Sequence, residues 1–402
     1  MPRKEHKFMI NKMFNKNNKS SAFTIVELIV VIVIIGILAS VIIVSYNNII
    51  QKAIAMSLVS DLKNASNQIK LYQIDNGKFP TSLGCPTEPT TDTICLKSSS
   101  NNTFTDFHAD NTSSPKTFQL SANHAGTMNY RTTDMTPPIE CPVGFIVVPG
   151  SATYGTNDFC VMKYEAKQVG SSSVPVSTAS GYPWVNISLN DAINNSKNVA
   201  NCSGCHLISE AEWLTITQNV LKEPNNWNTG TVGSGYIYSG HNDSMPDNPL
   251  EADTNDNNGH VGETSVTDSQ RRTLKLSDGE IIWDLAGNVR EITSDTGNGK
   301  TQPGIAGNAY ASWIDWKDVT TLGTLSPDPS PLGTGIAGAG SWSGSSSSGI
   351  GQRTSNPADT SDRAFFRGGF WRDGYAAGVL SLCLNNGPIF SSKSFVGFRV
   401  AR

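Results

Sequence analysis

The sequence SAFTIVEL, at residues 21–28, divides a basic segment from a long apolar one. Residues 1–22 hold six Lys or Arg residues and a single acid, Glu5. Residues 23–44 are apolar apart from four positions, one of which is Glu27. These 22 residues would form a helix roughly 33 Å long, at about 1.5 Å per residue, which is enough to cross a bilayer core. Because the basic cluster comes first, we expect it in the cytoplasm and the rest of the chain outside.

Two simpler interpretations of this segment are a cleaved secretory signal and a plain anchor helix. A secretory signal would have a shorter apolar region followed by a small-residue cleavage site. Here the apolar run continues into an amphipathic stretch, residues 46–71, whose apolar residues recur at helical spacing. Glu27 argues against both interpretations, because a carboxylate in an apolar helix is costly in lipid and usually functional.

The SAFTIVEL sequence closely resembles the prepilin cleavage motif of type IV pilins and pseudopilins. The resemblance implies that a prepilin peptidase cuts between Ala22 and Phe23 and methylates the new N-terminus. It also implies that Glu27 pairs with the terminal amine of a neighbouring pilin subunit, and that the chain passes from the membrane to a pilus or the cell surface. Ala22 stands where the family usually has Gly.

The remaining chain has the composition of an exported, loop-rich protein. Its net charge is −9, from 24 basic and 33 acidic residues, which argues against a nucleic-acid partner. Export would favour disulfides among the seven cysteines, with one left over. Cys85 and Cys95 are expected to close a loop, and Cys202 and Cys205 to form a local pair. The other two disulfide candidates are Cys141 and Cys160.

We expect an α+β chain with four segments. These are a leader at 1–22, a helix at 23–75, a small β region with its linker at 76–138, and a large domain at 139–402. Alternating runs at 117–120 and 128–130 predict a small sheet packed on the helix, and the TPP sequence at 136–138 predicts a linker. In the large domain only residues 188–200 and 209–221 have helical patterns, and the second begins with a capping box formed by Ser209 and Glu212. The Gly/Ser/Pro-rich residues 326–362 predict a surface loop.

Three motifs follow one another in the large domain. The first is FCVMKYEA at 159–166 and the second is HLISEAEW at 206–213. The third is a pair, WDLAGNVRE at 283–291 and FRGG at 366–369, which is followed by GFRV at 397–400. In this order the motifs resemble the formylglycine-generating-enzyme (sulfatase-modifying factor) domain, which has a C-type-lectin-like fold. The resemblance covers about residues 139–402.

The catalytic residues of that family are missing. The family has two cysteines, about six and eleven residues past the Arg of the RGG motif. Counted from Arg367, these places hold Asp373 and Gly378, and neither can be a thiolate nucleophile or bind copper. Cys383 lies further along the chain. We therefore expect no formylglycine synthesis and no enzyme activity of this kind.

Residues 367–402 resemble, more narrowly, the variable region of proteins diversified by retroelements. In such proteins a lectin-like fold forms a fixed frame, and adenine-directed mutagenesis changes selected codons of the AAY type. The resemblance implies a ligand-binding surface, with exposed aromatic residues for contact area and polar ones for specificity. The residues reachable from AAY codons, and so predicted to bind the ligand, are Phe370, Arg372, Asp373, Tyr375, Ser381, Cys383, Ile389, Phe390, Ser391, Ser392, Ser394 and Phe395.

Two further patterns concern cofactors. The sequence CSGCH at 202–206 matches a haem attachment pattern, but no axial partner is evident, so we expect a local disulfide and no haem. No second CxxC exists to complete a zinc site. The resemblance implies a structural Ca²⁺ on the GNxxE turn, and the acidic loop at 243–256 is expected to be solvated surface. The Ca²⁺ ligands would be the side chains of Asp284 and Glu291 and the carbonyls of Gly287 and Val289.

These patterns together predict a pilin-like surface protein that displays a diversified binding domain for an unknown extracellular protein or glycan. One alternative is a minor pilin or pseudopilin whose C-terminal domain is a fixed adhesive or structural part. Another is a surface enzyme with an unrecognised site. The lectin-like fold does not itself imply sugar binding, because function resides in the site.

Overall fold

The computed structural model covers all 402 residues. It describes residues 24–85, 92–112, 114–126, 128–256, 258–264, 268–298, 313–319, 327–331, 345–355, 361–384 and 393–402. The predicted leader at 1–22 and much of the predicted loop at 326–362 lie outside these ranges.

The N-terminal helix α1, Ile25–Asn76, agrees with the helix predicted at 23–75. The chain divides into two compact units between Ile54 and Ala55, within this helix. In the first unit every Ile, Leu and Val side chain from Ile25 to Leu38 is largely exposed. Among the described residues no helix has the length and apolar character needed to span a membrane, so the span predicted at residues 23–44 is not confirmed.

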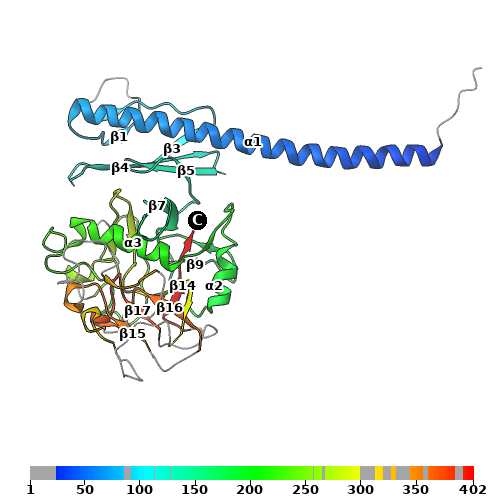
Figure 1. Cartoon of the computed structure of the whole chain (residues 1–402). Coiled ribbons are helices and arrows are strands. Elements are labelled where there is room, and N and C mark those ends of the chain that lie inside the picture. The colour runs from blue at the N-terminus through cyan, green and yellow to red at the C-terminus, as the bar shows by residue number, and fades with distance from the viewer. Residues whose placement is uncertain are drawn as a thin grey trace, which may run out of the picture. The chain divides into compact units, whose positions relative to one another are not determined.

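In the second unit, residues 55–76 of α1 lie along a four-stranded antiparallel sheet of order β3-β4-β5-β6 (Figure 1). Leu58, Leu62 and Ile69 are fully buried. Asp61, on the same face, accepts hydrogen bonds from Ser99 N at 2.9 Å and Asn102 Nδ2 at 2.7 Å. The strands of this part are β1 (Ser82–Leu83), β2 (Thr93–Ile94), β3 (Asn102–Asp110), β4 (Thr117–His124), β5 (Met128–Thr133) and β6 (Ile139–Glu140).

The predicted linker at 136–138 lies in the turn between the paired strands β5 and β6 and does not connect two separate domains. Thr136 is buried, and its carbonyl accepts a hydrogen bond from Thr132 Oγ1 at 2.8 Å. Immediately afterwards β6 pairs with β5, where Ile139 faces Arg131. The expected boundary at 138/139 therefore does not separate two compact units, because the sheet takes strands from both sides of it.

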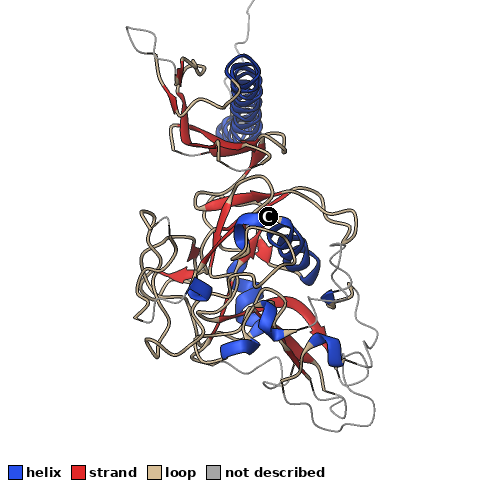
Figure 2. Cartoon of the chain, turned by 90° about the vertical axis from the view of Figure 1, so that its left-hand side faces the viewer, coloured by secondary structure: helices blue, strands red, loops and turns tan. Residues whose placement is uncertain are grey.

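The rest of the second unit consists of short elements joined by long loops (Figure 2). Its two main sheets have the orders β11-β19-β8-β7 and β15-β17-β16-β14-β18. The helices are α2 (Leu189–Ser196) and α3 (Glu210–Lys222). The strands are β7 (Phe145–Val148), β8 (Phe159–Met162), β9 (Lys167–Gln168), β10 (Pro175–Val176), β11 (His206–Leu207), β12 (Thr273–Lys275), β13 (Ile281–Trp283), β14 (Arg290–Gly297), β15 (Arg353–Thr354), β16 (Arg363–Arg367), β17 (Leu382–Cys383), β18 (Val396–Phe398) and β19 (Val400–Ala401).

Both predicted helices of this region are present, and their caps follow from the sequence. The capping box of α3 is confirmed, with Ser209 and Glu212 bonded reciprocally. Helix α2 is capped by Ser188 but ends at Ser196, four residues before the predicted end. The Ser196 hydroxyl donates to the carbonyl of Ala192 at 2.7 Å, a local bond of the kind that makes Ser a poor residue for continuing a helix.

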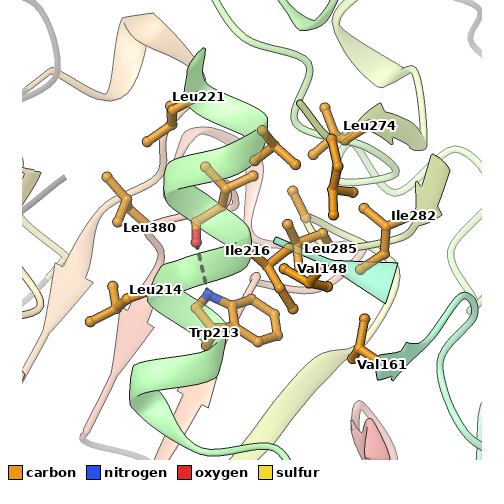
Figure 3. Packing of buried hydrophobic residues seen from close by; sticks show 14 of the residues in the cluster. Val148, Val161, Trp213, Leu214, Ile216, Leu221, Leu274, Ile282, Leu285 and Leu380 are labelled. Atoms are coloured by element: carbon orange, nitrogen blue, oxygen red, sulfur yellow. Dashed lines mark hydrogen bonds between the residues drawn. The ribbon is translucent and has the colours of Figure 1, made fainter. Parts of the chain in front are cut away.

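Helix α3 crosses the main hydrophobic core and carries Trp213, one of the tryptophans buried in it. Trp213 is fully buried among aliphatic side chains from several strands, and its Nε1–H donates to the carbonyl of Val379 at 3.0 Å (Figure 3). The hydrogen bond removes the cost of burying the indole nitrogen, so Trp213 joins α3 to the segment after the RGG motif.

Three disulfides join the six cysteines predicted to pair: Cys85–Cys95, Cys141–Cys160 and Cys202–Cys205. Cys141–Cys160 ties the segment between β6 and β7 to β8. The remaining cysteine, Cys383, is buried outside the disulfides.

Replacing Trp213 with Ala is expected to lower the free energy of unfolding by about 3–5 kcal/mol, because it leaves a cavity and removes the indole hydrogen bond to the Val379 carbonyl. Urea denaturation of the full-length chain in detergent measures this. Tyr375→Ala is the control, since that ring is 80% exposed, and should change stability by less than about 0.5 kcal/mol. Equal effects of the two substitutions would contradict the core described here.

Candidate functional site

Two buried arginine–carboxylate pairs bring the separated motifs of the C-terminal region together. Arg399 donates to Glu291 at 2.7 Å and also to the carbonyls of Met162 and Trp283, each at 2.8 Å. Arg367 of the RGG motif donates from Nε to both oxygens of Glu210, at 3.1 Å each. The side chains in both pairs have almost no exposed surface, so neither charge can turn toward water.

A third contact joins the first motif to the GNxxE turn. Glu165, fully buried, accepts hydrogen bonds from Asn288 Nδ2 at 2.6 Å and from Val289 N at 3.1 Å. Burial raises the pKa of Glu165 well above its usual range, and the neighbouring Asp284 carboxylate acts in the same direction. Buried polar contacts therefore join the first motif to the GNxxE turn and the second motif to the RGG motif.

The carboxylates predicted to bind Ca²⁺ have other partners in the structure. Asp284 receives two hydrogen bonds from Arg272, both at 2.8 Å, and Glu291 is held by Arg399. These guanidinium groups occupy the carboxylate oxygens that a cation would need. The side-chain geometry therefore gives no support to a calcium site formed by Asp284, Gly287, Val289 and Glu291.

The Arg290 side chain contacts several of the predicted ligand-binding residues. Its guanidinium pairs with the buried carboxylate of Asp373, at 2.7 Å, and lies 4.8 Å from the ring centroid of Phe370. Phe370 in turn stacks on Phe395, with 4.6 Å between ring centroids. Both rings are half-buried. We predicted Phe370, Asp373 and Phe395 as exposed contact residues, but Arg290 draws all three inward by charge and cation–π attraction.

The described part of the predicted surface that does face outward consists of Arg372, Tyr375 and Ser394, which we call the tip. Arg372 is fixed by an ion pair with Asp247, which also accepts a hydrogen bond from Trp371 Nε1 at 3.1 Å. The Arg372 guanidinium lowers the pKa of Asp247. We predicted the whole acidic loop as solvated surface, and nothing close to Asp247 in the sequence identifies Arg372 as its partner.

Two of the predicted contact residues are inaccessible and four lie outside the described residues. Ser381 and Cys383 are each about 1% exposed, so their side chains cannot contact a ligand without rearrangement. The physical reason is their place in or next to β17, which is covered by the core and pairs with β16. The residues outside the described ranges are Ile389, Phe390, Ser391 and Ser392.

The residues of the CSGCH sequence have structural partners. The two sulfurs bond to each other, as predicted. His206 Nδ1 lies 2.9 Å from the carbonyl of Gly204 and Nε2 lies 2.9 Å from Glu212 Oε1, so a doubly protonated ring can donate to both. The bond to Glu212 raises the pKa of His206.

At the N-terminus, the structure shows how Glu27 begins helix α1. Its Oε2 accepts from Thr24 N at 2.9 Å, while Thr24 Oγ1 accepts from Glu27 N at 3.2 Å. This is a capping box, which the spacing of Thr24 and Glu27 could have revealed in the sequence. Ala22 and Phe23, the residues of the predicted cut, lie outside the described residues.

Comparison with known proteins decides the class of this N-terminus. The family described as a prokaryotic N-terminal methylation motif matches residues 17–43. This N-terminus is of the type IV pilin and pseudopilin type.

Individual relatives are similar to this chain over a limited length. The type II secretion system core protein G of Aeromonas hydrophila is 38% identical over 66 residues, which is 16% of this chain and 46% of that protein. Its namesake in Escherichia coli K12 is 39% identical over 64 residues, 16% of this chain and 44% of the relative. The chain thus spans less than half the length of the curated relatives it matches.

The His206–Glu212 contact predicts a pH dependence of stability. A folded-state pKa raised above the ordinary 6.5 adds stability that is complete below that value and is lost as pH rises through the folded pKa. Thermal melts of the full-length chain should therefore show a falling melting temperature as pH increases across this window. In His206→Gln this slope should shrink; an unchanged slope would show that other groups cause it.

Proposed function

We propose that the chain is a minor pilin or pseudopilin-type subunit that displays a non-enzymatic, diversified ligand-binding domain on the cell surface. The observation that carries the proposal is the combination of a pilin-like N-terminus with a large C-terminal region of short strands and helices joined by long loops. The first feature supports assembly and the second supplies the surface that is displayed.

The apolar half of α1 supports assembly. From Ile25 to Leu38 its Ile, Leu and Val side chains are at least 47% exposed in the single chain. Burying each of them would contribute about 1.5–3 kcal/mol, so they need lipid before assembly or neighbouring helices after it. We propose that like helices of other pilin subunits cover this surface.

We propose that Glu27 fixes the register in which the α1 helices of neighbouring subunits pack. In the single chain its carboxylate is exposed and bonded only to Thr24 among the described residues. Inside a bundle of apolar helices it would be an uncompensated charge unless a cation pairs with it. The resemblance to pilins implies that this cation is the terminal amine of a neighbouring subunit, which is created by cutting before Phe23.

Glu27→Ala should leave peptidase cutting intact and prevent incorporation into sheared pili. Loss of a buried charge pair costs about 2–5 kcal/mol, so the incorporated fraction should fall by more than roughly tenfold. Immunoblots of the sheared and membrane fractions measure it. Asp75→Ala, which removes an exposed carboxylate near the other end of α1, is the matched control. Normal incorporation of Glu27→Ala would rule out this role.

The C-terminal region supports the display of a binding surface. We propose that residues 139–402 adopt the lectin-like fold of the formylglycine-generating-enzyme family, because buried polar contacts join its ordered motifs. A non-enzymatic role is supported by Asp373, which stands at a catalytic cysteine position and is held by Arg290.

The tip consists of residue types that are common in antibody paratopes. Tyr375 is 80% exposed and offers a large ring with few rotatable bonds, while the exposed Arg372 adds charge. Arg372 is anchored by Asp247, so it loses less side-chain entropy when a ligand binds. We propose that the tip, together with residues 389–392, forms the contact surface for an extracellular protein or glycan.

Sequencing the gene in sister cells tests the diversification. We expect adenine-derived changes clustered in codons 370–395, and at accessible positions such as Arg372 and Tyr375 more often than at the buried Ser381. Codons 272–291 serve as the internal control and should not vary. An invariant 370–395 segment would exclude diversification and favour the minor pilin with a fixed adhesive or structural domain.

A further inference from the structure

A buried histidine lies next to two carboxylates outside the contacts described so far. His241 is completely buried, and its Nδ1 lies 3.1 Å from Glu263 Oε2 and 4.0 Å from Asp243 Oδ1. One ligand atom from each of these residues lies within 4.8 Å of the other two. We propose that these three side chains form a binding site for a divalent transition-metal ion, with zinc as its simplest occupant.

The orientation of the imidazole supports the proposal. His241 Nε2 lies 3.0 Å from the carbonyl of Asn248, which can only accept, so Nε2 carries the proton. In the neutral ring, Nδ1 then directs its lone pair at the Glu263 carboxylate. A metal ion between them turns this repulsion into two coordinate bonds, and a metal-binding histidine usually donates its other N–H to such a carbonyl.

Glu263 provides the second, independent observation. Its side chain is fully buried, and Oε1 has no hydrogen-bond partner among the described residues. A proton on His241 would compensate the charge but leave this buried oxygen without a hydrogen bond, which is unfavourable. Coordination by both carboxylate oxygens satisfies it.

The set of ligand atoms indicates the class of metal. One imidazole nitrogen with carboxylate oxygens suits zinc and related transition metals, whereas Ca²⁺ takes oxygen ligands alone. The side chain of Asp243 is 25% exposed, which leaves a path for the ion and a position for water. Its Oδ1 also accepts a hydrogen bond from Met245 N at 2.9 Å, which fixes the carboxylate.

Two backbone hydrogen bonds connect the proposed metal site to the segment that carries the tip. Between its ligands, the carbonyl of Asn242 accepts from Gly374 N at 2.9 Å, and Ser244 N donates to the carbonyl of Trp371 at 2.7 Å. These bonds hold the backbone on both sides of Arg372. A metal ion that joins the 241–243 loop to Glu263 would therefore fix the backbone on which the tip is built, whatever the tip binds.

Isothermal titration calorimetry with ZnCl₂ tests the site on full-length protein in detergent, freed of metal and kept without reductant. We expect one Zn²⁺ per chain, with affinity reduced at least about tenfold in Glu263→Gln and in Asp243→Asn. Asp318→Asn, an exposed carboxylate elsewhere, is the control and should bind normally. Circular dichroism checks that each variant is folded.

A second measurement needs no variant. Wild-type protein loaded with Co²⁺ should show the absorption of nitrogen and oxygen ligands without a thiolate band, and Zn²⁺ should slow hydrogen exchange at Ser244 and Gly374. Failure of the wild type to bind Zn²⁺, equal binding by Glu263→Gln, or a thiolate band would overturn the proposal. None of these results depends on whether the tip is diversified.

Discussion

The burial of charged arginines is the constraint on which the C-terminal region depends. Arg272, Arg290, Arg367 and Arg399, which we call the arginine frame, each pair with a carboxylate away from water. Removing one partner of such a pair costs about 3–5 kcal/mol, because the other charge stays buried. Each pair therefore admits little variation in sequence or geometry, and together the pairs hold a loop-rich region with few long strands in one arrangement.

This constraint explains how a fixed fold can carry a variable surface. Arg367 and Arg399 secure both ends of the segment that holds the predicted contact residues, and Arg290 holds its inward-facing side chains. Among the predicted contact residues that the structure describes, Arg372, Tyr375 and Ser394 remain exposed and lie outside the core. The tip can change without removing a partner from any buried charge, which is the property that a diversified surface needs.

Local patterns predicted the elements well. Periodicity gave helix α1, the Ser209–Glu212 spacing gave the start of α3, and cysteine spacing gave two of the three disulfides as pairs. Local patterns could not show contacts between distant residues. Asp284 and Glu291 were predicted as cation ligands, and their guanidinium partners lie 12 and 108 residues away in the sequence. Phe370 and Phe395 looked exposed because nothing nearby in sequence reveals Arg290 beneath them. The missed His241–Glu263 contact spans 22 residues of irregular loop, where no periodicity brings side chains together.

In the proposed arrangement a pilin-like N-terminal helix carries a C-terminal region with a rigid arginine frame and a replaceable tip. Substitution tolerance tests most directly whether the arginine frame is fixed and the tip is free to vary. Random residues introduced singly at 372, 375 and 394, and separately at 272, 290, 367 and 399, can be compared by the protease resistance of the full-length chain. The account predicts that most residues are tolerated at the tip positions and almost none at the arginine positions. Tip positions as intolerant as the arginines, or arginines that are freely replaced, would contradict it.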